Sequence, residues 1–172
     1  TGAADGIGRA VALDYAQRDW DVTGLDVDAT RSAETADAIA AAGAAAHFIV
    51  ADLANPAAVA AALAELAQGP PIDLFVHSAG INCVGPFQSS AVAAQRKVVE
   101  LNLTAPLLLT AGLLRDELLN PGATLVFISS LSHFVGYPGA AVYAATKDGL
   151  ASFARSLAVA LAPEGIHVTT VF

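Results

Sequence analysis

Short apolar runs alternate along the chain with longer segments whose apolar residues recur at helical spacing. The short runs predict strands at Trp20–Asp26, His47–Val50, Ile72–Val76, Leu125–Ile128 and His167–Val171. The longer segments predict helices at Ile7–Arg18, Ala29–Ala42, Pro56–Gln68, Ala91–Leu119 and Val142–Ala162. Strands separated by helices predict an α/β fold, a doubly wound parallel sheet in which right-handed crossovers place helices on both faces.

Several of these segments carry start or stop signals. Asn55 before Pro56 predicts an N-cap followed by proline at the first helical position. Gly43 ends one helix, and Asn120-Pro121-Gly122 closes the long segment before the strand at Leu125.

Composition narrows the classes of protein that fit. The 172 residues suit one domain, residues 1–172, and 55% hydrophobic against 14% charged residues is the opposite of a disordered chain. The net charge of −8 disfavours binding to nucleic acid or to an anionic membrane, because both are negatively charged. No segment has the pattern of a signal peptide or a continuous membrane span, and Cys83 as the single cysteine fits a reducing, cytoplasmic setting.

The first eight residues, TGAADGIG, form a glycine-rich turn that leads into the first predicted helix. Gly2 permits a tight turn, Gly6 lets the backbone approach a pyrophosphate, and Gly8 allows close packing of the helix. The helix N-terminus then offers free N–H groups to phosphates. We therefore predict a Rossmann-type nucleotide site, although the same glycines also suit a plain packing turn.

Asp26 ends the second predicted element, 18 positions beyond Gly8. A carboxylate there can accept hydrogen bonds from both adenosine ribose hydroxyls and would repel a 2′-phosphate, which favours NAD over NADP. The alternative is a solvated carboxylate at a strand end. Arg9 is the nearby cation that would favour NADP instead.

Tyr143 and Lys147 lie four residues apart in a predicted helix and so share one face. A phenol is a poor base at neutral pH, but a nearby ammonium favours its phenolate form. Such a tyrosine can exchange a proton with an alcohol or a ketone. Ser129 and Ser130 end a predicted strand, where ligands bind in open α/β sheets.

Together these motifs closely resemble the short-chain dehydrogenase/reductase family over essentially all 172 residues. The turn matches TGxxxGIG, Tyr143 to Lys147 matches YxxxK, and Ser130 lies 13 residues before Tyr143, which selects it over Ser129. The resemblance implies a catalytic tetrad of Asn102, Ser130, Tyr143 and Lys147. It also implies a cofactor site formed by Gly2, Gly6, Ile7, Gly8, Asp26, Asp52, Leu53, Ala79 and Gly80, with Tyr143 and Lys147 facing the cofactor.

Pro106 lies four residues after Asn102 in the long predicted helix. Because proline has no N–H, the Asn102 carbonyl loses its helical partner, and we expect a kink there. In the family this carbonyl holds a water that links the lysine to solvent. We hypothesise that Pro106 reinforces this relay; a kink that serves only packing is the alternative.

The chain departs from the family pattern in two places. His77-Ser78 replaces two asparagines before Ala79-Gly80, and we interpret His77 as structural. The family also has a strand directly before the glycine turn and a further segment after residue 172, so we expect this sequence to be an excerpt without them. Six residues are substrate-pocket or loop-packing candidates: Asn82, Val84, Phe87, His133, Phe134 and Tyr137.

We therefore expect an NAD-dependent oxidoreductase that interconverts a secondary alcohol and a ketone, with a small-molecule substrate and no metal. One alternative is an NADPH-dependent reductase similar to the 3-oxoacyl-carrier-protein reductases, and another is a nucleotide-binding regulatory protein without turnover. The resemblance implies a homodimer or homotetramer that pairs through two long helices. Leu107–Leu119 and Ala151–Ala162 are apolar on more than one face, as such pairing requires.

Overall fold

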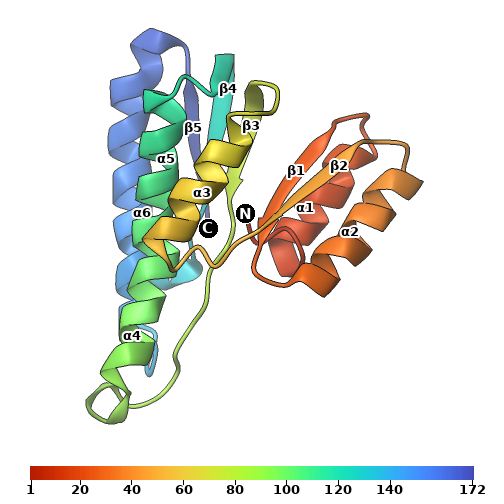
Figure 1. Cartoon of the computed structure of the whole chain (residues 1–172). Helices are drawn as coiled ribbons and strands as arrows, with labels where there is room; N and C mark the ends of the chain where they lie inside the picture. Colours follow the sequence, from red (N-terminus) through yellow and green to blue (C-terminus); the bar gives the residue numbers. More distant parts are fainter.

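The computed structural model describes all residues from Thr1 to Phe172. Five strands form, β1 (Val22–Asp26), β2 (Ala46–Val50), β3 (Ile72–His77), β4 (Leu119–Ile128) and β5 (His167–Val171). Six α-helices separate or precede them: α1 (Gly6–Ala16), α2 (Ala29–Ala41), α3 (Pro56–Leu66), α4 (Val92–Val99), α5 (Ala105–Arg115) and α6 (Ala141–Leu161). The alternation of strands and helices agrees with the sequence prediction (Figure 1).

All strand pairs are parallel, as predicted, but they form two sheets. β1 pairs with β2, and β4 lies between β3 and β5. At one end the two sheets are joined through the first residues of the chain, because Thr1 N donates to Val76 O and Gly2 N donates to Leu25 O, both at 2.8 Å. Elsewhere a cleft of about 600 Å³ runs between the facing edges of β1 and β3. The division falls where the family resemblance places a further strand.

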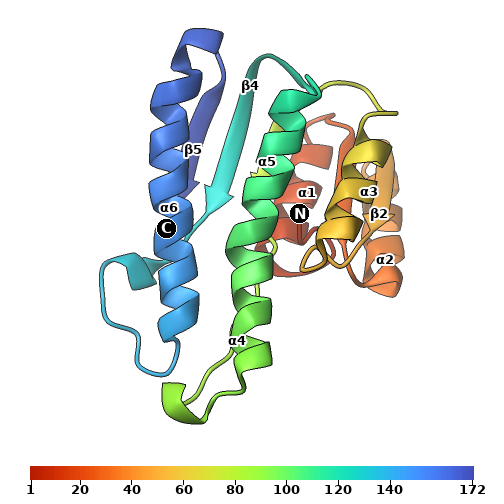
Figure 2. The same cartoon turned by 60° about the vertical axis from the view of Figure 1, so that its left-hand side comes forward.

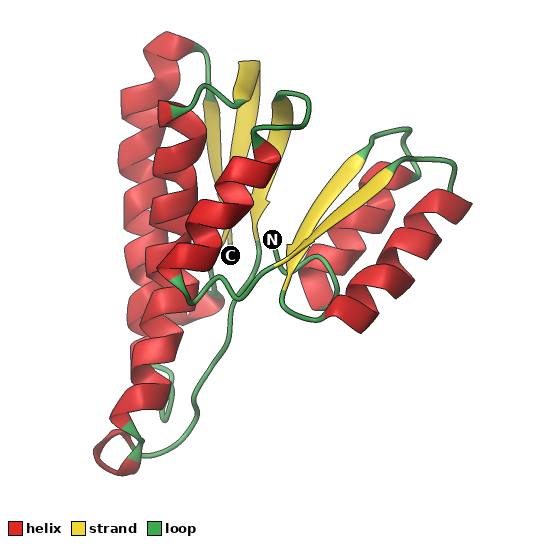
Figure 3. Ribbon diagram, in the orientation of Figure 1, coloured by secondary structure: helices red, strands yellow, loops and turns green.

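Helices lie on opposite faces of the two groups of strands. α1 and α2 pack on β1 and β2, whereas α3, α5 and α6 lie together on the other side (Figures 1 and 3). Figure 2 shows α6 and α5 beside β5 and β4, with α3 on the other side of α5, near β2. The main core lies between this helix layer and the strands, and its most deeply buried large side chains are Leu25, Leu109, Leu113, Leu125, Phe127 and Leu150.

Side-chain caps explain where three helices begin. Asp5 accepts from Gly6 N, Asp28 accepts from Arg31 N, and Asn55 accepts from Ala57 N, so each satisfies an N–H that the helix leaves free. Pro56 occupies the first turn after Asn55, as predicted from the sequence.

The long helix predicted at Ala91–Leu119 is wrong in two respects. It ends at Arg115, and residues 119–128 form β4, so Asn120-Pro121-Gly122 lies inside a strand rather than before it. The pairing of β3 with β4 is irregular there, and Gly122 has φ of 84°. A turn-forming tripeptide therefore produces a bulge in this strand.

The helix between α4 and α5 is also not a regular α-helix. Glu100–Thr104 forms one π-helical segment, in which Ala105 N donates to Glu100 O. Asn102 lies at its centre, and Pro106 is the second residue after its end. The expected interruption near Asn102 is thus a π-bulge, a feature that widens a helix where a proline removes a backbone donor.

The continuous helical stretch Val92–Arg115 is long and apolar enough to cross a membrane by length and composition alone. Leu109 and Leu113 of this stretch are buried in the main core. A core helix of a folded domain has this same character, and we describe it as one.

Candidate active site

The carboxyl ends of all five parallel strands meet at one edge, and the predicted site residues lie there. A cleft of about 330 Å³ opens between the end of β1 and the loop after β3. Eight of the predicted cofactor residues line it, namely Gly2, Gly6, Ile7, Asp26, Asp52, Leu53, Ala79 and Gly80. The structure therefore brings together residues that are far apart in the sequence.

Two glycines shape the turn that borders this cleft. Gly6 has φ of 50°, and a Cβ there would meet nothing within 4 Å, so its backbone is open to a ligand. Gly8 lies outside the cleft lining, and a Cβ on it would collide with Gly2 O and come within 2.9 Å of Thr1 O. Gly8 therefore allows α1 to pack against the turn, which agrees with its predicted packing role.

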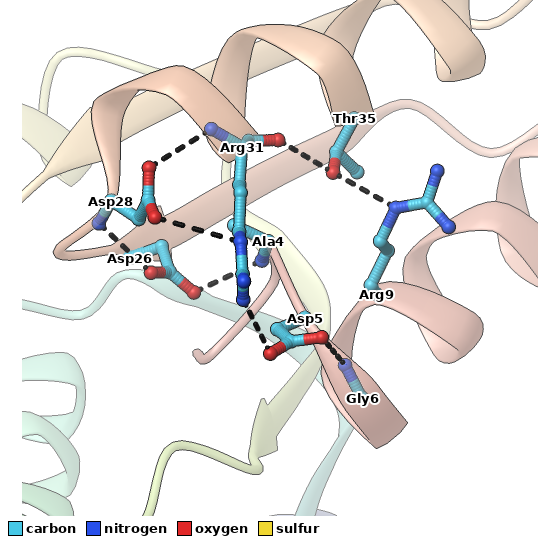
Figure 4. Close-up of polar contacts among 8 residues, drawn as sticks. All are labelled: Ala4, Asp5, Gly6, Arg9, Asp26, Asp28, Arg31 and Thr35. Carbon is cyan, nitrogen blue, oxygen red and sulfur yellow. Dashed lines mark hydrogen bonds and ion pairs between the residues drawn. The ribbon is translucent and has the colours of Figure 1, made fainter.

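Asp26 is held by two backbone amides at the end of β1. Ala4 N donates to its Oδ2 and Asp28 N to its Oδ1, each at 3.0 Å (Figure 4). A carboxylate oxygen has two lone pairs, so each oxygen keeps one acceptor position for a ligand. This geometry suits a pair of neighbouring hydroxyl groups such as those of a ribose.

Asp52 lies at the far side of the same cleft, after β2. Its Oδ1 accepts from Ala54 N at 3.0 Å, and its Oδ2 accepts from Lys97 Nζ of α4 at 3.3 Å. The sequence reasoning did not identify Lys97, because nothing in the local pattern places α4 beside the end of β2. Leu53 is buried behind Asp52 and anchors this loop in the core.

A second cleft, of about 410 Å³, adjoins the first. Gly80 and Ile81 line both clefts, so a ligand in one can reach the other. Ser130 and Tyr143 line the second cleft. The remaining lining is largely apolar or uncharged: Asn82, Leu131, Ser132, Val135 and Tyr137.

Lys147 lies beneath the junction of the two clefts and is buried, with 4% of its surface exposed. Its Nζ donates to Ile128 O at 2.8 Å and lies 5.8 Å from the centre of the Tyr143 ring. A Cβ on Gly80 would lie 3.4 Å from this Nζ, so a side chain there would crowd the lysine. Burial lowers the pKa of Lys147 from 10.5 to about 8.

Asn102 joins three elements at the same point. Its Nδ2 donates to Ile81 O at 2.8 Å and to Thr146 Oγ1 at 3.3 Å, and its Oδ1 accepts from Ile81 N at 2.8 Å. The side chain thus fixes the loop that both clefts share and ties it to α6 next to Lys147. A fully buried amide with these bonds is a rigid support for the site.

The two serines after β4 face different ways. Ser129 is buried and its Oγ donates to Lys147 O at 2.9 Å, which ties β4 to α6. Ser130 borders the second cleft, where its Oγ accepts from Ser132 N at 3.1 Å. The hydroxyl that a ligand can reach is therefore the one selected by its spacing from Tyr143.

The candidate pocket residues divide into three groups. Asn82 and Tyr137 line the second cleft. His133 and Phe134 instead form an aromatic cluster with Phe172, with ring centres 5.2 Å from that of Phe172 in both cases. Outside the cleft lining, two further candidates are exposed, Val84 and Phe87.

His77 is a core residue, which agrees with its structural interpretation. Its ring stacks on Phe127 with centres 4.6 Å apart, and its Nε2 is 3.1 Å from Thr110 Oγ1 of α5. Burial lowers its pKa well below 6.5. The histidine therefore links the sheet to α5 in its neutral form.

Two charged contacts beside the glycine turn were not predicted. Arg31 of α2 forms an ion pair with Asp5, with Nη1 at 2.6 Å from Oδ2. Arg9, the cation noted in the sequence, instead donates from Nε to Thr35 Oγ1 at 3.2 Å (Figure 4). No group of three or more histidine, cysteine, aspartate or glutamate side chains could hold a metal ion.

The sequence profile of the family described as short chain dehydrogenase matches residues 1–172. The chain belongs to the short-chain dehydrogenase/reductase family. Members are oxidoreductases that act on CH–OH or carbonyl groups with NAD or NADP. This short-chain dehydrogenase/reductase has two adjoining clefts at the carboxyl ends of its strands.

Known relatives agree on the family but differ in what they act on. The chain is 35% identical over 173 residues to cis-4-hydroxycyclohexanecarboxylate dehydrogenase of Sinomonas cyclohexanicum, covering 99% of this chain and 69% of that protein. It is 33% identical over 175 residues to a 3-oxoacyl-[acyl-carrier-protein] reductase of Aquifex aeolicus, covering 99% and 70%. The solved short-chain dehydrogenase of Sphingobium yanoikuyae in complex with NADPH has a TM-score of 0.89 and 28% identity, covering 98% and 66%.

Proposed function

We propose that this protein is an NAD-dependent oxidoreductase that interconverts a secondary alcohol and a ketone. The observation that carries the proposal is the pair of adjoining clefts, with Asp26 at the rim of one and Ser130 and Tyr143 on the wall of the other. Lys147 lies beneath the point where they meet, close to the Tyr143 ring.

The residues of the first cleft fit a dinucleotide. Asp26 keeps one free acceptor position on each oxygen for the ribose hydroxyls, and its negative charge disfavours a 2′-phosphate. The open backbone at Gly6 and the N-terminus of α1 suit the pyrophosphate. Asp52 and Leu53 border the part of the cleft that would take the adenine.

In the proposed reaction the bound nicotinamide ring supplies or accepts the hydride. Ser130 donates a hydrogen bond to the substrate oxygen, and Tyr143 gives that oxygen a proton during reduction or takes one during oxidation. The Lys147 ammonium, 5.8 Å from the centre of the Tyr143 ring, would contact the nicotinamide ribose. Asn102 is a positioning residue, because it acts through Ile81 and Thr146.

An NADPH-dependent ketoreductase is the second candidate. Two observations favour it: the relative in Aquifex aeolicus is a 3-oxoacyl-[acyl-carrier-protein] reductase, and the Sphingobium yanoikuyae structure holds NADPH. The position of Asp26 counts against it, because its carboxylate would face the 2′-phosphate.

The walls of the second cleft support an uncharged, partly apolar substrate, because no charged side chain lines it.

We further propose a cytoplasmic protein that forms homodimers or homotetramers. Leu108 of α5 and Val159 of α6 remain 40% and 77% exposed, and such apolar helix faces suit pairing between copies.

The test combines cofactor binding with turnover. Tyr143→Phe is expected to lower kcat for secondary alcohols by roughly 10²–10⁴-fold, the usual contribution of a proton-transferring side chain, and to leave NADH binding unchanged. Tyr15→Phe is the matched control, since Tyr15 of α1 packs against Trp20 outside both clefts, with ring centres 5.3 Å apart.

Each other outcome has a defined meaning. Binding of NADH and of NADPH is measured from the fluorescence of the cofactor. If the protein binds neither, the proposed function is refuted. Tighter binding of NADPH would favour the second candidate. Dinucleotide binding without turnover of any secondary alcohol or ketone would favour a regulatory protein.

A further inference from the structure

Arg31 extends from the start of α2 toward the glycine turn, close to Asp26 (Figure 4). Its Nη1 is 2.6 Å from Asp5 Oδ2, and its Nε is 3.6 Å from Asp28 Oδ2. Asp5 lines the first cleft, whereas Arg31 reaches the cleft through Asp5. The guanidinium is therefore held at the rim of the proposed adenosine site.

Asp5 is itself fixed by the start of α1. Its Oδ1 accepts from Gly6 N at 2.8 Å, which leaves Oδ2 for Arg31. One carboxylate thus caps a helix and holds a cation of another helix. Asp5 and Asp28 both pair with the Arg31 guanidinium, and Asp26 lies beside Asp28 on the same rim. Three carboxylates and one guanidinium give this rim a net negative charge.

We propose that Asp5 is a specificity-determining residue that engages Arg31 and so prevents it from binding a 2′-phosphate on the adenosine ribose. The inference rests on the proposed function, in which the first cleft takes a dinucleotide. It adds to Asp26 a second residue that favours NAD, and it gives Arg31 a defined part in that preference.

The chemistry of the pair supports this role. A guanidinium is always charged and presents parallel donors that match a phosphate, so a released Arg31 is a suitable 2′-phosphate ligand. The pair is also weakly held, because 76% of the Asp5 side chain and 55% of the Arg31 side chain are exposed to solvent. Removal of the Asp5 charge leaves the guanidinium with only the longer contact to Asp28, at 3.6 Å, and so makes it more available to a 2′-phosphate.

The experiment separates the charge of Asp5 from its capping role. Asp5→Asn keeps an oxygen that can cap α1 but removes the charge. Arg31→Gln removes the guanidinium, and the double variant completes a cycle. Asp14→Asn is the control for net charge, because Asp14 forms an exposed pair with Arg18 along α1, at 3.0 Å.

Two pairs of probes report on the 2′-phosphate. AMP and adenosine 2′,5′-bisphosphate are titrated by calorimetry, and NADH and NADPH are titrated by fluorescence. Asp5→Asn is expected to tighten binding of the bisphosphate and of NADPH by about tenfold, the equivalent of one added charge-assisted bond, and to leave AMP and NADH within about twofold. The double variant is expected to lose this gain, and Asp14→Asn is expected not to show it.

Three outcomes would overturn the inference while leaving dinucleotide binding in place. These are a gain that survives in the double variant, an equal gain in Asp14→Asn, and no gain in Asp5→Asn. Failure of the wild-type protein to bind both NADH and AMP would instead refute the proposed function itself. Circular dichroism of each variant confirms that α1 and α2 remain folded.

Discussion

At the scale of single residues, the site depends on an ammonium group that the fold buries without a carboxylate partner. Lys147 donates to Ile128 O, and burial lowers its pKa from 10.5 to about 8. A charged group in this position destabilises the folded state and serves the proposed chemistry.

This burial predicts a specific dependence of stability on pH. Between pH 8 and 10.5 the unfolded chain keeps the Lys147 proton and the folded protein releases it, so the free energy of unfolding should rise with pH across that window. The full contribution is about 3 kcal/mol for such a shift. In Lys147→Met this rise should be absent, as measured by urea unfolding at several pH values.

Lys97→Met is the matched control, because the Lys97 side chain is 55% exposed and should leave the wild-type slope intact. Equal slopes in the wild type and in Lys147→Met would contradict the prediction. Tyrosines also titrate at high pH, and the difference between the two proteins removes their contribution.

The sequence predicted Asp26, Ser130, Tyr143 and Lys147 at one edge because each follows a strand or shares a helix face. It could not predict the pairing of Asp5 with Arg31. Exposed side chains of this kind meet only when two helices pack, and no local pattern records their approach.

At the scale of elements, periodicity predicted the order and type of the strands and helices, and it failed at the end of the long predicted helix, which stops at Arg115 instead of Leu119. Gly122 produces a bulge within β4, and Pro106 follows a π-helical segment. The irregular pairing of β3 with β4 keeps Gly122 inside a strand. The interruption expected at Pro106 takes the form of a π-helical segment centred on the buried Asn102.

The contact between β3 and α5 gives a second pH prediction. His77 stays neutral in the folded protein, so the unfolded chain binds an additional proton below pH 6.5, and the free energy of unfolding should fall as pH decreases through that region. His77→Asn should be less stable at pH 7.5 by roughly 1–3 kcal/mol because it loses the stacking, yet its stability should depend less on acid.

His167→Asn provides the comparison, since His167 is an exposed residue of β5 and should leave the acid dependence of the wild type unchanged. Chemical unfolding at pH 7.5, 6.5 and 5.5 gives the slopes. If the free energy of unfolding falls equally between pH 7.5 and 5.5 in His77→Asn and in the wild type, His77 does not cause the acid dependence.

At the scale of the whole molecule, the proposed dinucleotide site spans both sheets. Asp26 ends β1 and Asp52 follows β2, whereas Ala79 and Gly80 follow β3. A ligand in this cleft contacts both groups of strands, so its binding energy should stabilise them as one unit, to which Thr1 and Gly2 already contribute by joining β1 to β3.

NADH at a hundred times its dissociation constant should therefore raise the free energy of unfolding by about 2.7 kcal/mol. Hydrogen exchange should show joint protection of the glycine turn at residues 5–7 and of the loop at residues 78–81, because both line the cleft. Asp26→Ala should reduce both effects through the loss of the ribose contact. Protection confined to the turn would mean that the ligand binds only the β1 and β2 side, and that the two sheets are not stabilised as one unit.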